Sequence, residues 1–208
     1  MRLFHWTLVL LVAGLVITAN IGGNMMEWHF RFGYATLTLI LFRLVWGVNG
    51  TYYARFANFL VGPGKILDYL KGGDARRPPG HSPLGSLSVL ALLAVLLLQA
   101  TLGLFSNDDI ASEGPLYKFI SKELSDRLTW FHTAFNIYLV YALIALHVLA
   151  ITFYLVRKKN LITPMFTGDV TTELDVPAAK DTAGRRVQAL LVLAVCAALV
   201  WVIVNLKP

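Results

Sequence analysis

The chain has 208 residues, of which 57% are hydrophobic and only 14% are charged, and its formal net charge is +6. Soluble domains carry about 25% charged residues, so this composition excludes a soluble core and indicates one integral membrane domain. The positive charge requires no nucleic-acid partner, because basic loops beside membrane helices account for it. We therefore expect contact with the lipid bilayer and none with nucleic acid.

Five segments are long and apolar enough to cross a membrane, which takes about 20 residues. The first carries Arg2 before its apolar run, as a secretory signal does, but His5 and Trp6 interrupt the start of that run, so we expect it to be retained. The predicted fold class is an all-α integral membrane protein, with a four-helix transmembrane bundle and a fifth C-terminal transmembrane helix. The five spans are roughly Leu3–Ala19, Phe30–Val48, Leu87–Phe105, Leu128–Val156 and Val187–Leu206.

The connections between the spans differ in length and charge. Residues 20–27 are typical of a tight turn, whereas residues 49–86 form a longer stretch in which Ile66, Leu67, Tyr69 and Leu70 indicate a short interfacial helix. Five spans place thirteen of the eighteen Lys and Arg residues on the side of the N-terminus and five on the other. The richer side is normally cytoplasmic, so we expect a cytoplasmic N-terminus and a C-terminus on the opposite side.

Four histidines fall at two matched depths in the membrane. His5 begins a helix that runs outward, and His29 begins one that runs inward. His132 and His147 lie on the fourth span, fifteen residues apart, which is about 22 Å at 1.5 Å per residue. His29 therefore shares the outer depth with His132, and His5 shares the inner depth with His147. At about 100° per residue, His132 and His147 differ by roughly 60° and face one bundle interior.

These pairs predict the axial ligands of two haem irons. Ionisable side chains are costly inside a membrane; a single histidine at a helix end is commonly an interfacial residue, but four at matched depths indicate a site. Two histidines on each iron fill both axial positions and favour electron transfer over oxygen chemistry. The chain has one cysteine, Cys196, and no Cys-x-x-Cys-His motif, so the haems would be held non-covalently and Cys196 is expected to be a packing residue.

Basic residues near both depths are candidates for the haem propionates. Arg43 lies fourteen residues beyond His29, about 21 Å deeper, at the level of the inner pair, and a buried guanidinium seeks a carboxylate. Its alternative is to extend to the inner membrane surface. Arg2 and Arg31 are candidates at the two ends, as are Lys122 or Arg127. His81, before the third span, is a candidate for a propionate contact, a quinone site or a plain loop position.

Small residues in the spans, such as Gly14, Gly33 and Gly103, would let a flat macrocycle or a neighbouring helix approach closely.

Six short motifs are spread over the first four spans and their connections. They are Arg2-Leu3-Phe4-His5-Trp6, Glu27-Trp28-His29-x-x-x-Gly33-Tyr34, Phe42-Arg43-Leu44-Val45-Trp46-Gly47, Gly80-His81-Ser82-Pro83-Leu84-Gly85, Asn107-Asp108-Asp109-Ile110 and Asn160-Leu161-x-x-Pro164-Met165. With these motifs, the chain from about residue 2 to 168 resembles the prokaryotic cytochrome b-561 family, which includes the cytochrome b subunits of nickel-iron hydrogenases.

The resemblance implies a four-helix core with two non-covalent b haems, ligated by His5, His29, His132 and His147. It also implies a bacterial inner-membrane protein that exchanges electrons between the quinone pool and a periplasmic cytochrome c or hydrogenase-like redox protein, with a quinone as a possible further ligand. We expect a cytochrome domain over residues 1–168, a cytoplasmic linker over 169–186 and the extra helix over 187–206. Thr133 stands where the family often has an acidic residue, which argues against a proton-coupled role there.

Other functions remain open at this stage. The protein could act as an oxidoreductase on a small molecule such as superoxide or a ferric chelate, or anchor a hydrogenase-like complex, so whether it is itself an enzyme stays undecided. A haem-free transporter with a histidine proton relay is disfavoured, because no Gly/Pro-broken helices recur in two matched halves. The acidic stretch 106–126 is either a docking surface for a basic cytochrome c or a solvated loop.

Overall fold

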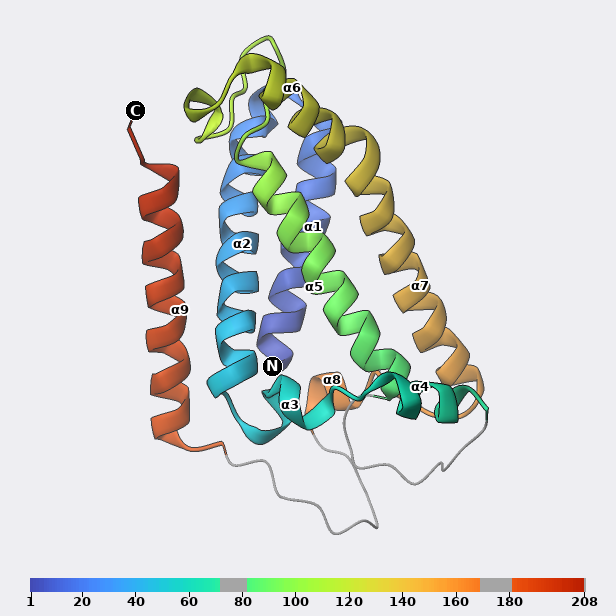
Figure 1. Cartoon of the computed structure of the whole chain (residues 1–208). Helices are drawn as coiled ribbons and strands as arrows, with labels where there is room; N and C mark the ends of the chain where they lie inside the picture. Colours follow the sequence, from blue (N-terminus) through green and yellow to red (C-terminus); the bar gives the residue numbers. More distant parts are fainter. Residues whose placement is uncertain (72–81, 169–180, 208) are drawn as a thin grey trace.

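The computed structural model describes residues 1–71, 82–168 and 181–207. In these parts of the chain, five helices are long and apolar enough to cross a membrane. They run alternately up and down, so the N-terminus and the C-terminus lie at opposite ends of the bundle (Figure 1). The predicted fold class, an all-helical membrane bundle with five spans, is confirmed.

The crossings are longer than the apolar runs that predicted them. The fourth begins at Lys122 rather than at Leu128, because the polar first turn is helical and Ser121 caps it by accepting a hydrogen bond from the Leu124 N–H. It also changes helix type in the middle, which the sequence pattern did not indicate. Four crossings are single helices, α1 (Arg2–Ile21), α2 (Met26–Asn49), α5 (Pro83–Gly103) and α9 (Ala183–Val204). The fourth in chain order is a continuous run of α6 (Lys122–Trp130), the π-helical η4 (Phe131–Asn136) and α7 (Ile137–Val156).

Short elements close the two ends of the bundle. We call the end of the bundle that holds the N-terminus the inner end and the opposite end the outer end, after the expected orientation. At the outer end, the turn from α1 to α2 depends on Gly22 and Gly23, whose φ angles of 68° and 52° suit glycine. The interfacial helix expected near Tyr69 is present as α4 and lies with α3 and α8 at the inner end (Figure 1). The short elements are η1 (Gly23–Met25), η2 (Tyr52–Ala54), α3 (Phe56–Phe59), α4 (Pro63–Leu70), η3 (Tyr117–Phe119) and α8 (Pro164–Thr167).

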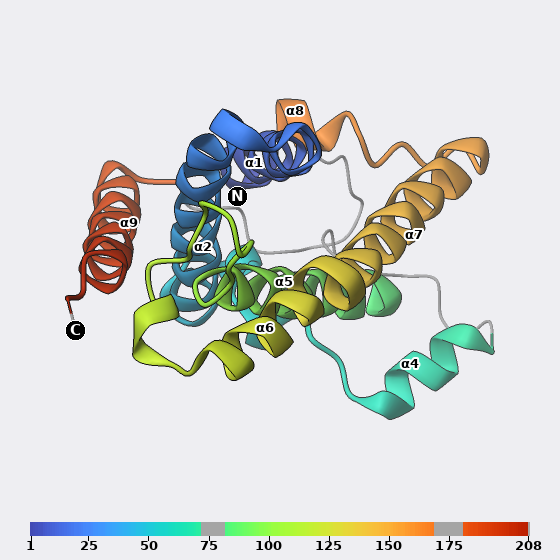
Figure 2. The same ribbon diagram turned by 90° about the horizontal axis from the view of Figure 1, so that it is seen from above.

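Helix α2 is the central element of the packing. It contacts α1, α5 and α9, and α5 in turn contacts α7. One apolar cluster joins α2, α5 and α7 through Ile40, Leu96 and Val140. Seen from above, α9 and α7 lie on opposite sides of α2 (Figure 2), so α9 is an addition to the four-helix core rather than part of it.

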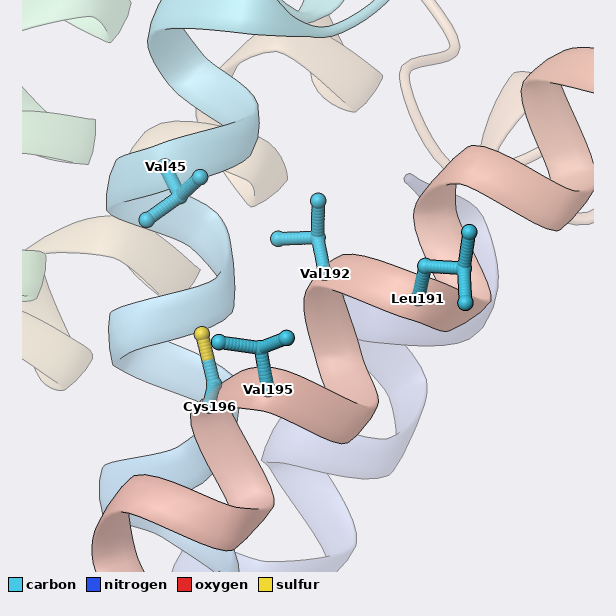
Figure 3. A pocket seen from close by; sticks show the side chains of 5 residues that line it. All are labelled: Val45, Leu191, Val192, Val195 and Cys196. Carbon is cyan, nitrogen blue, oxygen red and sulfur yellow. The ribbon is translucent and has the colours of Figure 1, made fainter.

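The interface between α2 and α9 is apolar and has an open pocket along its edge. Cys196 of α9 is 5% exposed and lines this pocket of about 210 Å³ together with Val45 of α2 (Figure 3). Long apolar side chains of α7 and α9 are exposed, among them Leu149 at 65% and Leu190 at 64%. Such faces match the hydrocarbon of a bilayer, where the backbone polar groups are satisfied within each helix.

Candidate functional site

The outer pair of histidines comes from two crossings. His29 lies in the first turns of α2, and His132 lies in the π-helical segment η4. Their ring centres are 6.3 Å apart and the ring planes are perpendicular. His29 and His132, which the sequence paired by their depth in the membrane, are therefore neighbours in the folded chain.

Each histidine of the outer pair has one ring nitrogen held by a backbone carbonyl. The Nδ1 of His29 is 3.0 Å from the Leu15 carbonyl oxygen, and the Nδ1 of His132 is 2.9 Å from the Gln99 carbonyl oxygen. A carbonyl can only accept a hydrogen bond, so Nδ1 carries the proton in both rings and Nε2 keeps its lone pair. Metal-bound histidines are commonly held in this way, and the bond orients the ring and raises its basicity.

The π-helical segment alters the rotation of the fourth crossing. A π turn has i→i+5 hydrogen bonds and takes up about one extra residue, so the offset between His132 and His147 changes from roughly 60° to roughly −40°. The sequence predicted one regular α-helix here. Both rings face the bundle interior, as expected, but a π turn rather than a regular α-helix gives them this orientation.

The inner pair is built from the first turn of α1 and the middle of α7. The ring centres of His5 and His147 are 6.4 Å apart, with 54° between the planes. The Nδ1 of His5 is buried and has no hydrogen-bond partner among the described residues. The inner pair thus has nearly the same spacing as the outer pair but, within the part of the chain that the structure describes, lacks its carbonyl acceptors.

The spacing of both pairs fits one iron between two imidazoles. An imidazole nitrogen binds a metal at about 2 Å and the ring centre lies about 1 Å behind it, so two rings on opposite faces of one iron have centres about 6 Å apart. Within the described residues, no group of three or more His, Cys, Asp or Glu side chains comes together, whereas a zinc site uses at least three protein ligands. Both pairs therefore suit haem rather than a mononuclear metal ion.

Gly103 leaves room for the outer ring. A Cβ atom built on Gly103, at the end of α5, would lie 3.1 Å from the His132 Cε1 atom. This distance is tighter than an ordinary carbon contact of about 3.5–4 Å. A glycine at this point lets α5 approach the imidazole closely.

Arg43 is a buried cation near the inner pair. It is 4% exposed, and its Nη1 atom has no hydrogen-bond partner among the described residues. Its Cζ atom lies 4.5 Å from the centre of the Phe56 ring and 5.9 Å from that of Phe59. Both rings belong to α3 (Phe56–Phe59), which lies at the inner end of the bundle (Figure 1), so Arg43 lies at that end. An orphaned guanidinium donor there suits a carboxylate ligand such as a propionate.

The other candidate cations have partners within the protein. The Arg2 Nη1 atom donates to the Phe166 carbonyl oxygen, and Trp6 donates to that of Met165 at 3.0 Å, so the α8 segment is fastened to the start of α1. Arg31 pairs with Glu27 on the surface. His81 lies outside the described residues, and its role stays a prediction.

Several charges of α6 and of the outer loop, which is the segment 104–121 between α5 and α6, are paired with one another. Lys122 lies 2.7 Å from Asp109 and 2.8 Å from Asp126, and Arg127 lies 2.6 Å from Glu123. These pairs reduce the acidic character that the loop sequence suggests.

Asp108 has a structural role in the same loop. Its Oδ1 atom accepts hydrogen bonds from the backbone N–H groups of Ile110, Ala111 and Ser112 at 3.0, 2.9 and 2.8 Å. These bonds hold the pKa of the carboxyl well below its usual range.

Sequence reasoning missed the polar residues that hold the histidines. Gln99 donates to the His132 carbonyl oxygen, and Asn136 donates to the Gln99 side chain and to the Val95 carbonyl oxygen. The Thr18 hydroxyl lies 3.3 Å from the His29 Nδ1. Amide side chains within otherwise apolar spans are unfavourable unless they are paired. This energetic cost was the signal available in the sequence, and it applies to Gln99 and Asn136 as much as to the histidines.

Comparison with models of protein families gives a match over most of the chain. A family model described as prokaryotic cytochrome b561 matches residues 1–168. No curated protein and no solved structure matches the chain. The matched range contains both histidine pairs and ends before α9.

Proposed function

Because the chain belongs to the prokaryotic cytochrome b561 family, which consists of haem b electron-transfer proteins of membranes, we propose that it holds two b haems and carries electrons across the bacterial inner membrane. The electrons would pass between the quinone pool and a redox partner in the periplasm, a cytochrome c or a hydrogenase-like protein.

The two histidine pairs are the observation that carries this proposal. His29 with His132 and His5 with His147 have nearly equal ring separations, 6.3 and 6.4 Å, and they lie at the two ends of the same bundle. Haem b supplies a one-electron couple when it is bound. The histidines would fill both axial positions and so keep oxygen from binding, and Arg43 would neutralise a propionate of the inner haem.

The charge distribution supports the orientation. Thirteen of the eighteen Lys and Arg residues fall on the side of the N-terminus, which the positive-inside rule assigns to the cytoplasm. The C-terminus and the loop between α5 and α6 would then face the periplasm, where the redox partner docks. Since Lys122 and Arg127 neutralise neighbouring carboxylates, we expect this docking to depend on the shape of the loop more than on long-range charge steering.

Haem content of the purified protein tests the proposal. A pyridine haemochrome assay is run on the wild type, on His29→Ala and His147→Ala, and on Gln188→Leu as a control on α9, where Gln188 bonds to Arg185. We expect two b haems in the wild type and in Gln188→Leu and one in each histidine variant. One haem or none in the wild type would overturn the proposal.

The proposed electron exchange with the quinone pool is tested on the same preparation. The protein is reconstituted in liposomes and mixed with a short-chain quinol under anaerobic conditions, and haem reduction is followed by absorbance. Reduction by the quinol supports the proposed role. If the haems do not react with the quinol, but chemically reduced protein is rapidly reoxidised by superoxide or a ferric chelate, the small-molecule oxidoreductase would be favoured instead.

A further inference from the structure

We propose that Gln99 is a positioning residue for the outer haem site, holding the His132 ring so that its Nε2 atom faces the iron. This inference rests on the proposed function, because it concerns a ligand of one of the two haems. It assigns a role to a side chain that is not itself a ligand.

Gln99 and His132 are joined by reciprocal hydrogen bonds. The His132 Nδ1 atom is 2.9 Å from the Gln99 carbonyl oxygen, and the Gln99 side-chain Nε2 atom donates to the His132 carbonyl oxygen at 3.0 Å. One bond fixes the ring and the other fixes the backbone that carries it. The same amide nitrogen lies 3.5 Å from the Nε2 atom of the His132 ring. This distance is at the limit of hydrogen-bond range, so the contact is too weak to occupy the lone pair of that atom.

Asn136 fixes the Gln99 side chain in turn. Its Nδ2 atom donates to the Gln99 Oε1 atom at 2.7 Å and to the Val95 carbonyl oxygen at 3.1 Å, and Asn136 is fully buried. His132 and Asn136 are the second and the last residues of the π-helical segment. The amide of Gln99 therefore spans this segment and ties it to α5.

This arrangement links the relative position of α5 and the π-helical segment to the hydrogen bonding of the His132 ring. The Gln99 carbonyl oxygen can serve His132 only while α5 and the π turn keep their relative position, and the Gln99 side chain supplies bonds that keep it. A histidine that donates from Nδ1 to a carbonyl is a more basic ligand, which stabilises ferric iron. His5 of the inner pair has no such partner among the described residues, so the effect is specific to the outer site.

The test replaces the amide without changing the length of the side chain. Gln99→Met keeps an unbranched chain and removes all hydrogen bonds of the amide. Gln188→Leu is the matched control, because Gln188 lies on α9, where it bonds to Arg185. Both variants and the wild type are purified with their haems, and the potential of each haem is measured by redox titration. The low-spin ferric EPR signal reports the orientation of the two imidazole planes, and the outer haem is identified as the one missing from His29→Ala.

We expect the outer haem of Gln99→Met to titrate at a higher potential than in the wild type and to show a shifted EPR signal, or to be lost alone. The inner haem, and both haems of Gln188→Leu, should be unchanged. Should Gln99→Met not accumulate, Gln99→Asn keeps an amide in the span but shortens its reach, and it is expected to shift the same two readouts. Outer-haem potential and EPR signal identical to the wild type would overturn the inference. A wild type without two haems would instead overturn the proposed function.

Discussion

Gly47 lies on α2 directly beneath the Phe56 ring, and this contact makes Gly47→Ala a sharp test of the packing around Arg43. A Cβ atom at position 47 would lie 2.0, 2.4 and 2.5 Å from three atoms of that ring. Ordinary carbon contacts are about 3.5–4 Å, so the ring would have to move by roughly 1.5 Å. A movement of this size would disturb the contact of the ring with the Arg43 guanidinium, whose Cζ atom is 4.5 Å from the ring centre.

The expected cost combines three contributions. A desolvated cation–π contact is worth about 2 kcal/mol, and overpacking adds about 1–3 kcal/mol. Replacing a helical glycine by alanine returns about 1 kcal/mol. Gly47→Ala should therefore lower the free energy of unfolding by about 2–4 kcal/mol, which corresponds to roughly 5–15 °C in melting temperature for a chain of this size.

Thermal unfolding of the haem-loaded protein in detergent measures this change. Gly184→Ala is the matched control, since a Cβ atom there meets nothing within 4 Å in the first turn of α9, and it should melt at or above the wild-type temperature. In a Phe56→Ala background, Gly47→Ala should cost almost nothing, because the clashing ring is gone. Equal melting temperatures for Gly47→Ala and Gly184→Ala would refute the reasoning.

Three further predictions concern the two haem sites and the outer loop. Gly103→Leu should release the outer haem alone, because a Cβ atom there is already 3.1 Å from the His132 ring; two haems in the purified variant would contradict it. Arg43→Met should leave two haems but lower the potential of the inner one, because a buried positive charge is removed, and an unchanged redox titration would count against this placement. Asp108, whose pKa is held down by three backbone N–H groups, should keep its loop as resistant to proteolysis at pH 5 as at pH 7. Since the folded pKa is the lower one, protection should decline only below about pH 4, the unfolded pKa. Asp108→Ala, which removes the acceptor of all three bonds, should open the loop already at pH 7.

Depth in the membrane follows directly from chain position. A helix advances about 1.5 Å per residue, so the positions of His5, His29, His132 and His147 along their spans were enough to pair them. The structure places the same side chains together. The number of crossings was equally predictable, because each apolar run must be long enough to span the bilayer.

Lateral contacts were beyond the reach of the sequence pattern. The placement of Phe56 and Phe59 against Arg43 depends on a short helix that folds back under the bundle. The fastening of α8 to Arg2 and Trp6 joins residues far apart in the chain. Periodicity describes which face of a helix is apolar, but it does not say which neighbour that face meets.

The sequence by itself determined the membrane class, the five crossings and the depths of the four histidines, because these depend on hydrophobicity and on rise per residue. Only the tertiary structure decided the π turn at His132 and the bonds of Gln99 and Asn136 that hold it, because rotation about a helix axis and lateral register are set by the helices that pack against one another. The side chains that orient a ligand therefore become visible only when the bundle is assembled.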